Sequence, residues 1–203
     1  CSSDLVIRLD MSWAGSSAHE LNAYLNQAFK EYEQKYNIET SPANTLSNRF
    51  NTIIQSVNQQ TGQQVVVLVE GYDSPLLNSW NTPHHEECVS IYLNVFTILK
   101  ADDEYEEFVL ITGTTKFTKL SLFSGLNNLS NISFEPEYAA ICGITKEELQ
   151  NDFKPEIEKL ADYENWTFDE AVAQLQAHYG GYHFSQRNMT EIFNPFSLIK
   201  ALS

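Results

Sequence analysis

Two strongly apolar runs along the chain predict buried strands. Residues 65–69 read VVVLV and residues 108–113 read FVLITG. Continuous β-branched runs are typical of parallel strands, so we expect helices to cover both faces of the sheet that they form. A third run, 4–12, alternates apolar and polar residues and predicts a shorter strand that ends in Asp10-Met11-Ser12.

Apolar residues three to four positions apart predict the helices between these strands. We expect helices over 18–36, 46–62 and 86–99, the first of them opened by a capping box of Ser17 and Glu20. Strands that alternate with helices of this length predict an α/β fold with a parallel sheet.

The pattern becomes helical near residue 144. Two further capping boxes occur there: Thr145 with Glu148, and Thr167 with Glu170. They predict helices over 146–161 and 168–179, and Asn194-Pro195 predicts a last short helix. We therefore divide the chain into an α/β core over 1–143 and a C-terminal helical lobe over 144–203.

Composition excludes several classes of function. The 203 residues contain 12 Lys and Arg against 27 Asp and Glu, which gives a net charge of −15. Binding to nucleic acid or to an anionic membrane needs a basic surface, so we expect neither. No apolar run reaches the roughly 18 residues of a membrane span. Three cysteines argue against a disulfide scaffold and predict a cytoplasmic protein.

Polar residues follow both apolar strands. Glu70 and Asp73 come after the first, and Thr112, Thr115 and Lys116 come after the second. The carboxyl ends of parallel strands meet at one sheet edge, where α/β proteins bind ligands. A P-loop NTPase places a Mg²⁺-binding acid and a phosphate sensor there. From the residues alone, Tyr-Asp-Ser-Pro over 72–75 fits a solvated turn as well.

Other clusters have ordinary structural explanations. The sequence HHEEC over 84–88 lacks the spacing of a zinc hydrolase, and we interpret it as an acidic helix start. His178 and His183 flank a helix stop at Gly180-Gly181. The acidic run 102–107 fits a solvated loop.

Several long blocks, in order, are similar to one known family. They are VVVLVEGYDSPLL (65–77), FVLITGTTKFTKLSLFSGLNNLSNIS (108–133), PEYAAICGITKEEL (136–149), YGGYHFS (179–185) and NPFSLIKALS (194–203). On these blocks the chain resembles the AAA-ATPase-like family of bacterial P-loop ATPases, which often carry a C-terminal nuclease-like domain of the PD-(D/E)XK type.

The resemblance implies an ATP and Mg²⁺ site. Glu70 would bind Mg²⁺, Thr112 would sense the terminal phosphate, and Asp73 and Lys116 would support them. The remaining residues implied to reach the nucleotide are Thr115 beside the sheet, and His183 and Arg187 from the helical lobe.

Two departures from the family pattern change the expected activity. The family has an Asp-Glu pair where this chain has Glu70 and Gly71, so the acid that would position the attacking water is absent. The pattern GxxxxGK[ST] does not occur in the 203 residues. We therefore expect a P-loop NTPase sheet without its N-terminal strand and phosphate-binding loop, followed by a small helical lobe.

This interpretation leaves two alternatives for function. The first is part of an ATPase whose intact parent uses ATP as a conformational switch, with turnover impaired or absent in this chain. The second is a non-catalytic interaction or regulatory module that keeps the fold. A nuclease is disfavoured because no Asp…Glu-x-Lys pattern stands out. The partner is unknown, and an unpaired sheet edge would favour self-association.

Overall fold

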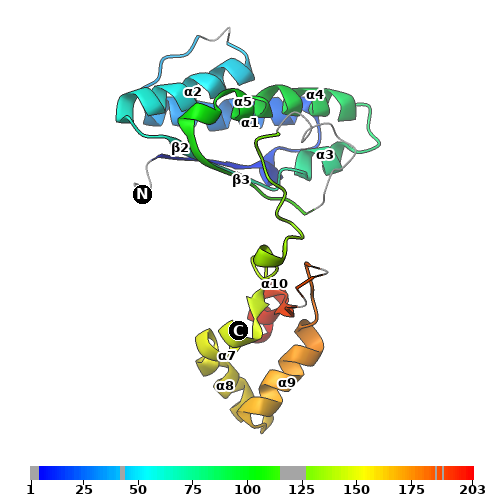
Figure 1. Ribbon diagram of the computed structural model, residues 1–203. Coiled ribbons are helices and arrows are strands. Elements are labelled where there is room, and N and C mark those ends of the chain that lie inside the picture. Colours follow the sequence, from blue (N-terminus) through cyan, green and yellow to red (C-terminus); the bar gives the residue numbers. More distant parts are fainter. Residues whose placement is uncertain (1–4, 42–43, 115–126, 186, 189) are drawn as a thin grey trace. The chain divides into compact units, whose positions relative to one another are not determined.

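The chain forms two compact units, 1–129 and 130–203. The computed structural model describes residues 5–41, 44–114, 127–185, 187–188 and 190–203, and Figure 1 draws them along the chain. The division falls upstream of residue 144, where the sequence becomes helical.

A three-stranded parallel sheet forms the centre of the first unit. Its strands are β1 (Val6–Asp10), β2 (Val65–Glu70) and β3 (Glu106–Ile111), and β2 lies between the other two. Parallel neighbours need long crossover connections, and helices supply them here. The predicted α/β class and parallel sheet are confirmed.

The predicted helices form where their capping residues start and stop them. Helix α1 (Ala18–Lys35) begins at the Ser17–Glu20 capping box. Helix α2 (Leu46–Thr61) ends at Gly62, whose positive φ of 67° suits glycine. Helix α4 (His85–Phe96) continues into the short α5 (Ile98–Ala101). The connections also contain η2 (Met11–Trp13), α3 (Ser74–Ser79) and η3 (Asp103–Tyr105).

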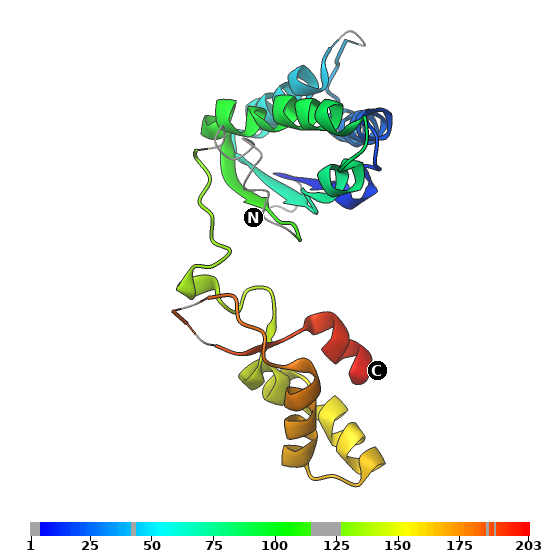
Figure 2. The same cartoon turned by 90° about the vertical axis from the view of Figure 1, so that its right-hand side faces the viewer.

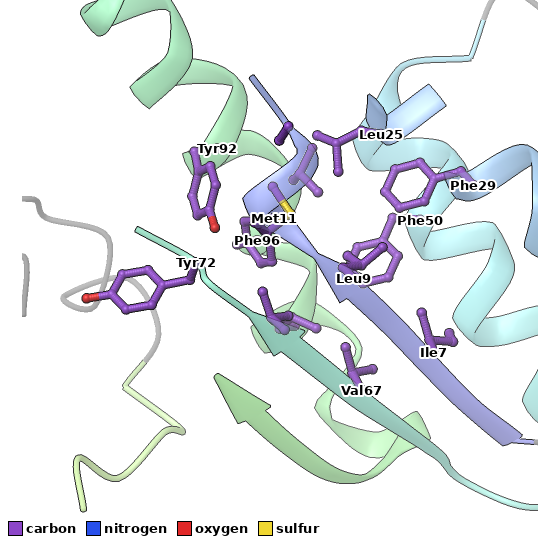
Figure 3. Packing of buried hydrophobic residues seen from close by; sticks show 14 of the residues in the cluster. Ile7, Leu9, Met11, Leu25, Phe29, Phe50, Val67, Tyr72, Tyr92 and Phe96 are labelled. Atoms are coloured by element: carbon purple, nitrogen blue, oxygen red, sulfur yellow. The ribbon is translucent and has the colours of Figure 1, made fainter. Parts of the chain in front are cut away.

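Side chains from the sheet and helices meet in one core. Figure 3 shows Ile7, Leu9 and Val67 pointing from the strands toward Phe29 and Phe50 on the helices. The two phenylalanine rings stack with centroids 5.2 Å apart. This contact joins α1 to α2 above the sheet.

The helices cover only one face of the described sheet, as Figures 1 and 2 show. On the opposite face Val66, Leu68 and Leu110 remain partly exposed, and Phe108 is 53 % exposed. The prediction that 65–69 is buried on both faces is therefore wrong for the described residues. An apolar run reports the character of a strand but not how many layers cover it.

Tyrosines of α1 occupy the outer edge of β1. The Tyr32 hydroxyl accepts a hydrogen bond from the Arg8 amide at 2.7 Å and donates to the Arg8 carbonyl at 3.1 Å. Tyr24 and Asp10 line the same pocket as Tyr32 and Arg8. The backbone groups of Arg8 are thus satisfied by a side chain, which opposes the addition of another strand at this residue.

The second unit contains helices and a small two-stranded antiparallel sheet. Its elements are η4 (Pro136–Tyr138), β4 (Ile144–Thr145), α7 (Lys146–Asp152), α8 (Lys154–Glu164), α9 (Phe168–Tyr179), β5 (Ile192–Phe193) and α10 (Pro195–Ala201). Strands β4 and β5 pair antiparallel, which the sequence did not predict. Both predicted capping boxes form.

The single helix predicted over 146–161 is wrong. It is divided at Phe153 because Pro155 lies in the first turn of α8 and cannot donate a backbone hydrogen bond to a preceding helical turn. Leu149, Ile157 and Leu175 from the three helices share one apolar core with Phe193.

Among the helices of the described part of the chain, none has the length and apolar character needed to cross a membrane.

Glu106 is a buried acid at the start of β3. Neither of its carboxylate oxygens has a hydrogen-bond partner. Burial, with the charges of Asp102 and Asp103, raises its pKa from 4.5 to about 8. The Asp102 carboxylate accepts hydrogen bonds from the side-chain amides of Asn51 and Gln55. Glu106 therefore holds a proton at neutral pH while its neighbour is satisfied by amides.

The raised pKa predicts that stability falls as pH rises from about 4.5 to about 8. In that range the unfolded state has lost the Glu106 proton and the folded state keeps it, so unfolding releases a proton. Urea unfolding across this range measures the slope. Glu106→Gln should flatten it, whereas Glu107→Gln, at the exposed neighbouring position, should leave it unchanged. An equal slope in wild type and Glu106→Gln would contradict the assignment.

Candidate functional site

The carboxyl ends of β1, β2 and β3 form the candidate site. Asp10 and Glu70 are direct partners in the register of β1 and β2. The Thr112 amide donates to the Val69 carbonyl at 2.8 Å, so Thr112 continues the pairing of β3 with β2. The topology thus brings an acid from each of two strands and a threonine from the third to one edge.

Glu70 is ion-paired. Its Oε2 accepts a hydrogen bond from an Arg8 guanidinium nitrogen at 2.7 Å, across the β1–β2 pair. Both side chains are largely in water, where such a pair contributes little to stability. The pair nevertheless places the positive Arg8 guanidinium beside the carboxylate that the sequence predicted as a Mg²⁺ ligand.

Asp10 was missed as a site residue. Its Oδ1 accepts hydrogen bonds from the Ser12 amide and hydroxyl, and its Oδ2 accepts one from the Trp13 indole N–H at 3.1 Å. Hydrogen bonds from Ser12 lower the pKa of this carboxyl below its usual value. The sequence signal was the Asp-Met-Ser strand end, which has the same position on β1 that Glu70 has on β2.

Asp73 is fully buried and joins two strand-end segments. Its Oδ1 accepts a hydrogen bond from the Thr114 amide at 3.1 Å. A Cβ on Gly113 would lie 2.5 Å from this oxygen and 2.5 Å from the Tyr72 ring. Gly113 is therefore required for the close approach, and Asp73 fastens the start of α3 to the segment that follows β3. The turn expected over 72–75 leads directly into α3.

Gly71 lies where the family resemblance places the second acid. It adopts a left-handed φ of 57°. A Cβ there would lie 3.2 Å from the Ser74 hydroxyl and 3.4 Å from the Ser12 amide. A side chain at this position would meet both backbone strain and a close contact.

Among the other predicted site residues, Thr112 lies at this edge with its side chain exposed. Thr115 and Lys116 lie outside the described residues. His183 and Arg187 are exposed in the second unit, so their predicted approach to a nucleotide stays a prediction.

The carboxylates at this edge are bonded to groups of the protein itself. Asp10, Glu70 and Asp73 each accept hydrogen bonds from protein groups. Within the described ranges, no group of three His, Cys, Asp or Glu residues is placed to hold a metal ion. Mg²⁺ is usually held by one or two carboxylates, with waters and substrate phosphates as its other ligands, so the Mg²⁺ role of Glu70 stays a prediction.

The histidine cluster at the start of α4 has a structural role. His85 Nδ1 lies 3.0 Å from the Ser79 hydroxyl, and the His85 and Trp80 rings form a T-shaped contact with centroids 4.9 Å apart. Cys88 is buried, and burial raises its pKa. These contacts close the loop between α3 and α4.

Comparison with known proteins places the chain in a family. Residues 2–123 match the family model described as "Predicted AAA-ATPase". The chain is also 34 % identical over 152 residues to an "Uncharacterized protein in vnfD 5'region" of Azotobacter chroococcum mcd 1. That alignment covers 74 % of this chain and 27 % of the relative, so the chain spans about a quarter of the relative's length. No solved structure matches.

Asp73→Ala should lower the free energy of unfolding by about 1.5–3 kcal/mol, because it removes a hydrogen bond to a charged group and leaves the Thr114 amide without it. Glu70→Ala is the matched control. Its exposed ion pair predicts a change of no more than about 1 kcal/mol. Urea unfolding of both variants measures the difference. Equal effects would contradict a structural role for Asp73.

Gly71→Ala should destabilise the protein by more than Gly62→Ala. Both glycines have positive φ, and an alanine there costs about 1–2 kcal/mol of backbone strain. A Cβ at Gly62 meets nothing within 4 Å, whereas one at Gly71 meets Ser12 and Ser74. Thermal unfolding compares the variants, and an equal loss at both positions would show that the crowding at Gly71 is harmless.

Proposed function

Because the chain belongs to the predicted AAA-ATPase family, we propose that it is part of a P-loop NTPase domain whose intact parent binds ATP with Mg²⁺. The observation that carries the proposal is the shared edge of three parallel strands, where Glu70 lies beside Asp10 and next to Thr112. Ligands of α/β proteins bind at this kind of edge.

The roles at this edge follow from the family resemblance. In the parent, Glu70 acts near the metal, Thr112 senses the terminal phosphate, and Asp73 fixes the segment from which Lys116 and Thr115 follow. The buried hydrogen bond of Asp73 to Thr114 supports this positioning role. His183 and Arg187 are further proposed contacts from the second unit.

In these 203 residues alone we propose little or no ATP binding. The described edge carries three carboxylates, and its Arg8 is engaged by Glu70. The sequence contains no GxxxxGK[ST] loop, whose backbone amides and lysine hold phosphates in P-loop proteins. An anionic edge repels a triphosphate, and Gly71 supplies no carboxylate to position water.

Isothermal titration of ATP with Mg²⁺ into the chain tests this proposal. We expect heats no larger than those of dilution, with Mg²⁺ alone as the control titration. Micromolar affinity would contradict it. Were binding seen, its loss in Glu70→Gln would place the nucleotide at this edge and would overturn the claim that the phosphate-binding loop is essential.

A second candidate function is a non-catalytic interaction module. The observation that favours it is the exposure of Trp13 and Trp80, which are 77 % and 52 % exposed. Tryptophan is enriched at the energetic centres of protein interfaces. A module of this kind would use the family fold as a scaffold, and its binding would not depend on ATP.

A further inference from the structure

Two exposed tryptophans lie on neighbouring elements of the first unit. Trp13 belongs to η2, which follows β1, and Trp80 ends α3, which follows β2. These elements pack against each other, and the Asn78 side-chain amide donates to the Gly15 carbonyl at 3.4 Å between them. Leu77, in the last turn of α3, is 41 % exposed. Figure 1 shows α3 beside the end of β1.

Both rings are held by other side chains. The Trp13 indole N–H donates to Asp10, and the Trp80 ring forms a T-shaped contact with His85, which is itself bonded to Ser79. Fixing such side chains before binding reduces the entropy lost when a partner docks. The exposed aromatic area is therefore pre-organised rather than loose.

The two chain segments that carry these tryptophans contain acids and no bases, and Arg8, which precedes the first segment, is paired with Glu70. Residues 9–29 and 50–99, which include η2, α3 and α4, contain no Lys or Arg. The acids in these two ranges are Asp10, Glu20, Glu70, Asp73, Glu86 and Glu87. Glu86 and Glu87 are exposed in the first turn of α4, directly after the histidine that supports Trp80.

We propose that Trp13, Leu77 and Trp80 form a docking surface for an arginine- or lysine-bearing segment of another protein. Cationic groups bind over tryptophan faces, and aliphatic stems of the same residues pack on leucine. Glu86 and Glu87 add attraction for the positive charge. This proposal goes beyond ATP handling and does not depend on it.

Charge argues against the other occupants of this surface. A nucleotide or nucleic acid would be repelled by the same carboxylates. A second copy of the chain carries the same excess of 27 acids over 12 bases, so the net charges of two copies repel each other. A cationic partner is the occupant that complements both the rings and the charge.

Titration with two short peptides tests the proposal. The probe is a hexapeptide that alternates Arg and Leu, with acetylated and amidated ends, and its counterpart replaces each Arg by Glu. We expect calorimetry to detect binding of the Arg peptide alone and to find that added salt weakens it. No binding, or equal binding of both peptides, would overturn the proposal.

Three tryptophan variants locate the binding surface. Trp13→Ala and Trp80→Ala should each weaken binding of the Arg peptide about two- to fivefold. Trp166→Ala, in the second unit, is the matched control and should bind like wild type. Circular dichroism checks that all three remain folded. Wild-type affinity in both Trp13→Ala and Trp80→Ala would show that the peptide binds elsewhere and would refute the surface.

Sedimentation of the chain alone separates this partner from a second copy. We expect a monomer at the concentrations used for calorimetry. A dimer that Trp80→Ala dissociates would assign the surface to self-association and would overturn the cationic partner.

Discussion

Strand β2 lies between β1 and β3, and its side chains Val65, Val67 and Val69 are fully buried beneath the helices. Burial of this face stabilises the first unit, because the apolar area removed from water is the largest favourable term in folding. The parallel arrangement of the strands then determines where each strand ends. Each crossover must return over the sheet, so all three strands end on the same side and deliver their polar residues to one edge.

That shared edge gathers negative charge, and the structure satisfies each carboxylate differently. Glu70 pairs with Arg8, Asp10 accepts hydrogen bonds from Ser12 and Trp13, and Asp73 is buried against the Thr114 amide. A buried carboxylate without such a donor would be costly. These bonds explain how three acids share a small region, and why Asp73 acts on the backbone around the site rather than in the solvent.

Local signals in the sequence predicted most of this arrangement. Capping boxes such as Ser17–Glu20 act within one helical turn, so they are readable from adjacent residues. The uncovered sheet face was not predictable, because Val66 and Leu68 have the same apolar character whether or not a layer lies over them. Asp10 was missed because its importance depends on its register with Glu70, sixty residues away along the chain. The burial of Asp73 likewise depends on Gly113, which lies in the segment after β3, forty residues away along the chain.

Gly71 and the two exposed tryptophans are linked through the same two elements, η2 and α3. Gly71 has a left-handed backbone, and a Cβ there would lie 3.2 Å from the Ser74 hydroxyl and 3.4 Å from the Ser12 amide, so a carboxylate side chain would meet backbone strain and a close contact. Those two elements are also the ones that carry Trp13 and Trp80. The glycine that stands where the family resemblance places a second acid therefore lies close to both elements of the proposed docking surface.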